Sequence, residues 1–129
     1  MHHESENFDR GKVAETEQLS KNGLSKNYNP VKEIDPRTGK EGTTIPDAFK
    51  NDGKSTTEVK NVKEQSLTRQ LRLQERFSNN NGFKPELIIN DLAQLTKPLI
   101  YSSFEIKTYD FKELTPADKQ VSRDKNLKP

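Results

Sequence analysis

Residues 44–90 read TIPDAFKNDGKSTTEVKNVKEQSLTRQLRLQERFSNNNGFKPELIIN, and this stretch decides the fold. Two strand-like segments, Thr44–Phe49 and Ser55–Val62, flank the turn-forming sequence Asn51–Lys54. A tight turn between two such segments predicts a β-hairpin. Because side chains alternate along a strand, Glu58 and Lys60 share one face of the second segment.

A helix and a further strand follow the hairpin. Hydrophobic residues four apart predict an amphipathic helix over Ser66–Asn80, with Ser66 as its N-cap and Gly82 at its C-terminal end. The apolar segment Glu86–Asn90 is typical of a buried strand, and another strand is expected around Phe104–Phe111. The order strand, strand, helix, strand predicts an α/β (α+β) fold, in which helices flank a small mixed β-sheet.

The rest of the chain is more polar. Its 129 residues include 28% hydrophobic residues and carry a net charge of +2, which suits one small domain. We expect this domain to span residues 11–112, between a flexible N-terminus or tag remnant (1–10) and a polar C-terminal tail (113–129). A helix is expected over Lys12–Asn22, ended by Gly23.

Composition excludes several kinds of site. The sequence has no cysteine, and its only histidines are His2 and His3. A thiol nucleophile and a cysteine-bound metal are therefore excluded, and the lack of a histidine after residue 3 argues against a serine–histidine hydrolase. Catalysis would have to use carboxylates, lysine, hydroxyls or an oxygen-bound metal. No apolar run reaches the roughly 18 residues that a membrane-spanning segment needs.

Three charged side chains are expected to meet in the hairpin. Asp47 lies at the end of the first strand, and the hairpin brings it near the face shared by Glu58 and Lys60. Two carboxylates and a backbone carbonyl, for which Val59 is the natural donor, are suitable ligands for Mg²⁺ or Mn²⁺. Lys60 would then position or deprotonate a water, or stabilise charge on a phosphate. The alternative is that Asp47 caps a turn beside an exposed Glu58–Lys60 pair, and spacing alone does not decide between the two.

The helix adds a basic stripe to this arrangement. Three arginines recur at i, i+3 and i+7 and so share a face. With a lysine just before the helix they would suit a phosphate backbone, and the candidate nucleic-acid-binding residues are Lys63, Arg69, Arg72 and Arg76. The alternative is a solvated helix face with no ligand.

Three motifs carry a resemblance to a known family. IPD at 45–47, EVKNV at 58–62 and SLTRQLR at 66–72 occur in this order. They resemble the PD-(D/E)xK nuclease superfamily and, more narrowly, restriction-endonuclease-fold toxin domains of bacterial polymorphic toxins of the contact-dependent inhibition type. The resemblance covers Gly11–Leu99 and is close over Ile45–Arg72. It implies a restriction-endonuclease-like core and an irregular loop between Gly23 and Thr44.

The resemblance also implies two further site residues. Glu15 matches the family's helix-borne glutamate, which makes it a further metal or water ligand, and Glu17 competes for that role. Gln70 resembles a residue that the family keeps near the metal, where it would orient the attacking water or a phosphate.

By the same resemblance, the chain is expected to be a Mg²⁺-dependent endonuclease and the C-terminal part of a larger secreted toxin. It would act in the cytoplasm of a target bacterium and be blocked by a cognate immunity protein. DNA is the preferred substrate and transfer RNA the alternative. A non-catalytic nucleic-acid-binding module is the competing hypothesis.

Overall fold

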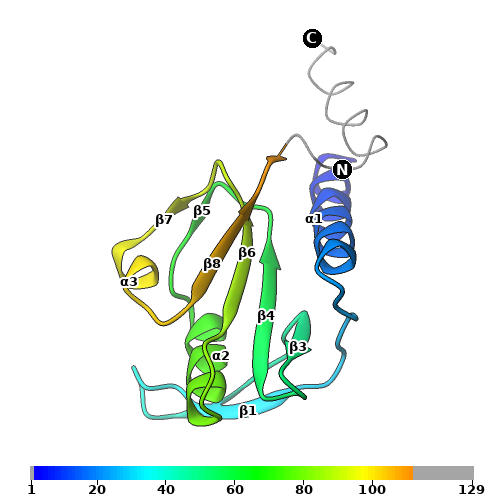
Figure 1. Ribbon diagram of the computed structural model, residues 1–129. Helices are drawn as coiled ribbons and strands as arrows, with labels where there is room; N and C mark the ends of the chain where they lie inside the picture. The colour runs from blue at the N-terminus through cyan, green and yellow to red at the C-terminus, as the bar shows by residue number, and fades with distance from the viewer. Residues whose placement is uncertain (1, 112–129) are drawn as a thin grey trace.

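A four-stranded mixed sheet forms the centre of the computed structural model, which describes residues 2–111, with side chains from residue 10 onward (Figure 1). Its strands are β3 (Ala48–Lys50), β4 (Ser55–Lys60), β6 (Glu86–Asn90) and β8 (Glu105–Tyr109), in the spatial order β3-β4-β6-β8. β3 pairs with β4 antiparallel, whereas β4, β6 and β8 run parallel. The predicted mixed sheet and its strand at residues 104–111 are confirmed.

The predicted hairpin is present, but its first strand begins later than expected. Asn51, Asp52 and Gly53 adopt positive φ angles of 55°, 58° and 79° in the turn between β3 and β4. β3 begins only at Ala48, because the preceding Thr44 ends another strand and Pro46 has no N–H to give a ladder. Asp47 therefore precedes strand β3 instead of ending a strand.

The connection from β4 to β6 runs through helix α2 (Arg69–Asn80). Its N-cap is Thr68, whose hydroxyl accepts a hydrogen bond from the N–H of Leu71 at 3.4 Å, so the prediction of Ser66 is wrong. The segment just before the helix forms strand β5 (Glu64–Gln65), which pairs in parallel with the later strand β7 (Gln94–Leu95), so the helix starts later than predicted.

Both long helices end on a glycine, as predicted. Gly82 has φ +84°, and the N–H of Phe83 reaches back to the carbonyl of Ser78 at 2.9 Å. Gly23 has φ +68°, and Leu24 bonds to the carbonyl of Leu19 at 2.8 Å in the same way. These are Schellman ends, in which glycine adopts the left-handed conformation at low cost.

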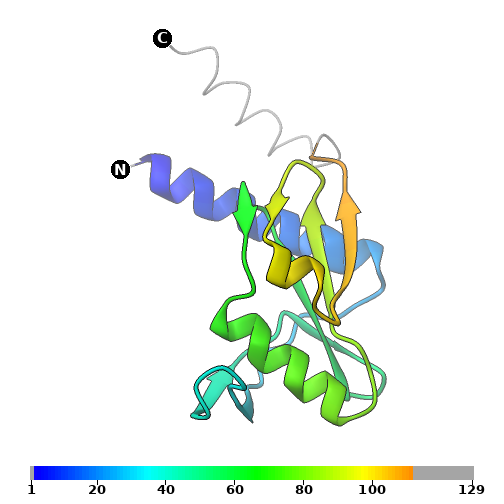
Figure 2. The ribbon, with the colours of Figure 1, turned by 90° about the vertical axis from the view of Figure 1, so that its left-hand side faces the viewer.

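Helices cover both faces of the sheet (Figures 1 and 2). Helix α1 (His2–Lys21) packs on one face over a core of Ala14, Leu19, Ala48, Val59, Ile88 and Tyr109. Helix α2 and the short α3 (Lys97–Ile100) lie on the other, over Leu71, Leu87, Ile89, Leu99 and Phe104. The helices flanking the sheet are as predicted.

Helix α1 is longer than the predicted Lys12–Asn22. It begins at His2 and thus includes most of the segment expected to be a flexible N-terminus. Residues 2–10 contain neither proline nor glycine, so nothing in that stretch interrupts the helix. The expected C-terminal tail, 113–129, lies outside the described residues.

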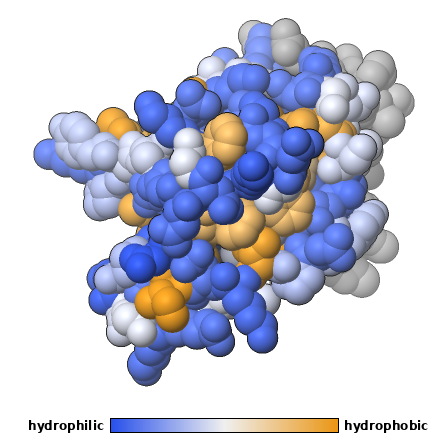
Figure 3. Space-filling model, turned by 60° about the horizontal axis from the view of Figure 1, so that its bottom comes forward, coloured by the Kyte–Doolittle hydropathy of each residue, from blue (hydrophilic) through white to orange (hydrophobic). Residues whose placement is uncertain are grey.

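The expected irregular loop between Gly23 and Thr44 contains a second hairpin. β1 (Val31–Ile34) and β2 (Glu41–Thr44) pair antiparallel and pack against α2. Figure 3 shows the lower face of the molecule, where hydrophilic residues surround apolar ones that gather mainly near the middle of the face. Within residues 2–111, none of the helices is long and apolar enough to span a membrane.

Candidate active site

Asp47 lies at the edge of the sheet, one residue before β3 begins, and hydrogen bonds fix its position. Its Oδ2 accepts a hydrogen bond from the backbone N–H of Val59 at 2.8 Å. Its own backbone carbonyl accepts from the N–H of Asn27 at 2.8 Å. The carboxylate thus takes the place of a strand partner beside β4. Since the N–H and C=O of one strand residue point to the same side, the carbonyl of Val59 is directed toward this edge as well.

Glu58 lies beside Asp47 and is 3% exposed. Its Oε1 accepts hydrogen bonds from the backbone N–H of Asp47 at 3.3 Å and from Nε2 of Gln74 at 3.0 Å. Burial, and then the charge of Asp47, raise the pKa of the Glu58 carboxyl to about 7, although Gln74 and the charge of Lys60 oppose that shift. A buried pair of carboxylates of this kind would be stabilised by a cation.

Lys60 and Gln70 complete this side of the site. The Nζ of Lys60 lies 3.6 Å from Oε2 of Glu58 and 3.5 Å from Oε1 of Gln70. Gln70 in turn donates to Oε2 of Glu58 at 3.2 Å. The structure therefore brings together four of the predicted residues, with Glu58 and Lys60 on the face of β4 that is turned toward α2.

Glu15 reaches the cluster from the opposite side, through a lysine. The Nζ of Lys26 contacts Oε2 of Glu15 and lies 3.2 Å from Oδ1 of Asp47. Glu17 instead borders a separate depression on α1, together with Lys12, Val13, Thr16, Ser20 and Lys21. Of the two glutamates considered, Glu15 is the one placed beside Asp47.

Two residues of the site are missing from the sequence-based prediction. Gln74 is fully buried on α2 and donates to both Glu58 and Thr44. Its position one helical turn after Gln70 is a sequence feature that could have revealed it. Lys26 lies in the loop after α1, where no spacing rule connects it to the hairpin. Burial lowers the pKa of Lys26, but its hydrogen bonds to Glu15 and Asp47 outweigh this and raise it above the ordinary value.

The predicted basic stripe lies where α2 meets the β1–β2 hairpin. Nε and Nη2 of Arg72 each donate to the carboxylate of Asp35 at 2.9 Å, and Nη1 donates to the carbonyl of Leu67 at 2.9 Å. Arg76 pairs with Glu33 at 3.5 Å. Arg72 is therefore engaged in holding the hairpin to the helix.

The other two basic candidates are exposed. The guanidinium of Arg69 passes over Gly42 of β2, where no Cβ stands in its way. Lys63 follows β4 and borders a cavity of about 370 Å³ together with Arg10, Asn61, Val62, Asn90, Leu92 and Phe111. Both lie close in sequence to the ends of β4 and α2 that carry the candidate site.

The donor set suits a hard divalent cation. Carboxylate oxygens of Asp47 and Glu58 and the carbonyl of Val59 are the ligand types that Mg²⁺ and Mn²⁺ take. The side-chain oxygen of Gln74 is buried beside Glu58 and has no partner among the described residues, so the site retains an unused acceptor. Among the side chains that the structure describes, those of residues 10–111, no three acidic side chains gather as they would around one metal ion, and the ammonium of Lys26 contacts both Glu15 and Asp47.

Comparison with known proteins places the chain in a family. None of the curated proteins and none of the solved structures matches it significantly. The family described as "Restriction endonuclease fold toxin 7" matches residues 11–99, a range that includes every residue of the cluster described above. The mixed sheet flanked by helices is consistent with that fold. The chain therefore belongs to the restriction endonuclease fold toxins, and its family suggests a nuclease toxin.

Proposed function

We propose that this chain is a metal-dependent nuclease toxin that hydrolyses phosphodiester bonds. The observation that carries the proposal is the convergence of Asp47, Glu58 and Lys60 at one edge of the sheet. These residues come from a hairpin and not from a continuous motif, and the turn Asn51–Lys54 brings them together. Family membership supports the reaction class.

Asp47, Glu58 and the carbonyl of Val59 would hold the cation, with Glu15 as a further ligand. When bound, Mg²⁺ or Mn²⁺ supplies a Lewis acid that polarises a phosphate oxygen and acidifies a water. The hydrogen bonds from Val59 and Gln74 fix the two carboxylates in advance, so their orientation does not have to be acquired on binding.

Lys60 and Gln70 would act on the attacking water and the phosphate. Lys60 is partly buried and held between Glu58 and Gln70, which directs its ammonium toward the site. There the ammonium can position a water or stabilise negative charge that develops on phosphorus-bound oxygen, whereas deprotonation of the water would require the neutral amine. Gln70 has a donor and an acceptor on one amide and can orient either group.

Nucleic acid would approach along the exposed basic residues near the site. Lys63, Arg69 and Arg76 are suited to contact phosphates, while Arg72 would act on the nucleic acid mainly by fixing the β1–β2 hairpin. DNA is the preferred substrate, because most domains of the superfamily that the motifs resemble cut DNA. Transfer RNA is the second candidate.

Delivery into a competing bacterium and inhibition by a cognate immunity protein belong to the same proposal. The family's description as toxins supports it. Expression of the folded, unprotected chain in a bacterial cytoplasm is expected to stop growth, and the Lys60→Ala variant is expected to be tolerated. Normal growth of cells that contain soluble wild-type protein would contradict the toxin role.

A cleavage assay tests the chemistry directly. Wild type, Asp47→Ala and Lys60→Ala are incubated with plasmid DNA and with total transfer RNA, in Mg²⁺, Mn²⁺ or EDTA. Lys54→Ala, at the opposite end of β4, is the matched surface control. Metal-dependent cutting that is lost in the first two variants and kept in the control is the expected result. A folded wild type that binds either substrate without cutting it would favour the non-catalytic module.

A further inference from the structure

Lys26 lies on a loop that is hydrogen-bonded to the segment containing Asp47. The loop follows α1, and its Asn27 is 8% exposed. Asn27 donates from its backbone to the carbonyl of Asp47 at 2.8 Å and from its side chain to the carbonyl of Pro46 at 2.9 Å. The backbone beside Lys26 is thereby held against the segment that carries Asp47.

The ammonium of Lys26 joins two carboxylates from separate elements. It contacts Glu15 of α1 and Asp47 at the start of β3. The side chains of these acids are 21% and 13% exposed, so their charges are only partly screened by water. A positive charge between them offsets their mutual repulsion, as a metal ion in that place would.

Lys26 also has open space beside its present position. Its side chain is 38% exposed, more than either of its partners. It lies beside a cavity of about 600 Å³ that Glu15 and Tyr28 also border, and the ring of Tyr28 lies 5.9 Å from its Nζ. An ammonium near an aromatic face is favourably placed, and Lys26 makes this contact in addition to its two ion pairs, so the contact can be kept when the ion pairs break.

We infer that Lys26 is a resident counter-ion that competes with the divalent cation for Glu15 and Asp47 and moves aside when the cation binds. This inference rests on the proposed function, because it presumes that Asp47 is a metal ligand. It assigns to Lys26 two effects of opposite sign. The lysine stabilises the metal-free protein, and it weakens the affinity for the metal.

The test compares Lys26→Met with Lys26→Arg in two measurements without substrate. Calorimetric titration with Mn²⁺ is expected to show binding about tenfold tighter for Lys26→Met, which corresponds to the loss of its two partly exposed ion pairs, with Glu15 and with Asp47. Lys26→Arg, which keeps the charge, is expected to stay within a few-fold of wild type. In EDTA, Lys26→Met is expected to melt at a lower temperature than wild type.

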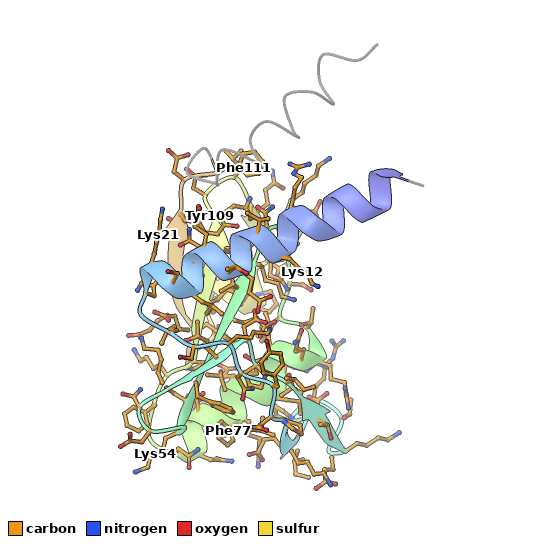
Figure 4. The ribbon with its side chains drawn as sticks, turned by 90° about the vertical axis from the view of Figure 1, so that its right-hand side faces the viewer. Lys12, Lys21, Lys54, Phe77, Tyr109 and Phe111 are labelled. Carbon is orange, nitrogen blue, oxygen red and sulfur yellow. The ribbon has the colours of Figure 1, made fainter. Side chains whose placement is uncertain are left out.

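Lys12→Met is the matched control. Lys12 lies on α1 (Figure 4) and borders the same cavity, so its substitution removes one positive charge from the same region and leaves Lys26 in the chain. If it tightens Mn²⁺ binding as much as Lys26→Met does, overall charge explains the effect and the inference is wrong. Unchanged binding in Lys26→Met, with a wild type that does bind Mn²⁺, also overturns it but leaves the proposed function intact. If neither folded protein binds Mn²⁺, the proposed function fails as well.

The movement itself can be followed by lysine acylation. Peptide mass spectrometry would report the rate at which each lysine reacts with an acylating reagent, with and without Mn²⁺. Lys26 is expected to react faster when Mn²⁺ is present, because its ion pairs with Glu15 and Asp47 are broken. An unchanged or slower rate in protein that has bound Mn²⁺ would show that Lys26 stays in place.

Discussion

Glu58 shows how burial of one residue makes the metal-free protein sensitive to pH. Its carboxyl has a pKa of about 7 in the folded chain, against 4.5 for the ordinary side chain, because burial and Asp47 disfavour the ionised form. Between these values the folded state holds more proton than the unfolded state. The free energy of unfolding contributed by this group is therefore fully present below pH 4.5 and is lost as the pH rises through 7.

We predict that Glu58→Gln removes this dependence. In EDTA, the variant is expected to gain stability relative to wild type between pH 5 and pH 8, by on the order of 2 to 3 kcal/mol. Urea unfolding at the two pH values measures the difference. Parallel stability curves for the two proteins would contradict the assigned shift, and Asp52→Asn in the exposed β3–β4 turn is the control for a general charge effect.

Among the elements, α2 depends on a cap that the sequence alone assigns to the wrong residue. Thr68 accepts the hydrogen bond of the first turn, whereas Ser66 precedes the helix. Thr68→Ala is expected to cost about 1 kcal/mol in chemical unfolding, and Ser66→Ala close to nothing. If Ser66→Ala lowered the free energy of unfolding more than Thr68→Ala does, Ser66 would be the N-cap.

The ion pairs Arg72–Asp35 and Arg76–Glu33 join the β1–β2 hairpin to α2, and the first is the more buried of the two. Arg72 donates a hydrogen bond to each carboxylate oxygen of Asp35, which is 1% exposed. Hydrogen bonds from Arg72 are the main cause that holds the pKa of Asp35 well below its usual range. The stability from this pair is therefore fully present at neutral pH and is lost only as the pH falls below the ordinary pKa of an aspartate, through the lowered value of the folded state.

Arg72→Ala is accordingly expected to lower the melting temperature by roughly 5–10 °C at neutral pH. Arg76→Ala, which removes a longer and more exposed pair, is the control and is expected to change it little. Equal effects of the two substitutions would show that the hairpin does not depend on Asp35.

The two hairpins also show which elements a sequence can predict. The β3–β4 turn is encoded locally, since Asn51, Asp52 and Gly53 tolerate positive φ angles. The β1–β2 pair is not, because it is held by Arg72 and by the close passage of Arg69 over Gly42, both on a helix that follows later in the chain. Contacts of this kind are invisible to turn and periodicity rules.

At the scale of the whole molecule, the residues of the site also divide into those placed by local sequence and those placed by contacts between distant parts of the chain. Asp47, Glu58 and Lys60 could be predicted because one short hairpin joins them. Lys26 could not, because the path of the loop after α1 decides its position. Gln74 is a different case, because its place one helical turn after Gln70 puts it on the same face of α2, and that spacing could have been used to predict it.

The distribution of basic residues over the molecule predicts how nucleic acid binds. Lys63 and Arg69 are exposed, and Arg76 is only loosely paired, whereas Arg72 is fully engaged with Asp35 and Leu67. Each phosphate contact releases condensed counter-ions, so losing one reduces the salt dependence of binding by about one unit of log K per log salt. In an Asp47→Asn background, Arg69→Ala and Lys63→Ala are each expected to produce that change with DNA.

Lys54→Ala is the control for this measurement, because Lys54 lies in the β3–β4 turn, away from the end of β4 that carries Lys60 (Figure 4). Fluorescence anisotropy between 50 and 200 mM salt gives the slopes. If Lys54→Ala lowers the slope as much as Arg69→Ala, the nucleic acid is not confined to the face beside α2. Slopes that all equal that of the parent would mean that the basic residues on α2 serve the fold, and phosphate recognition must then come from Lys26 and Lys60 within the site.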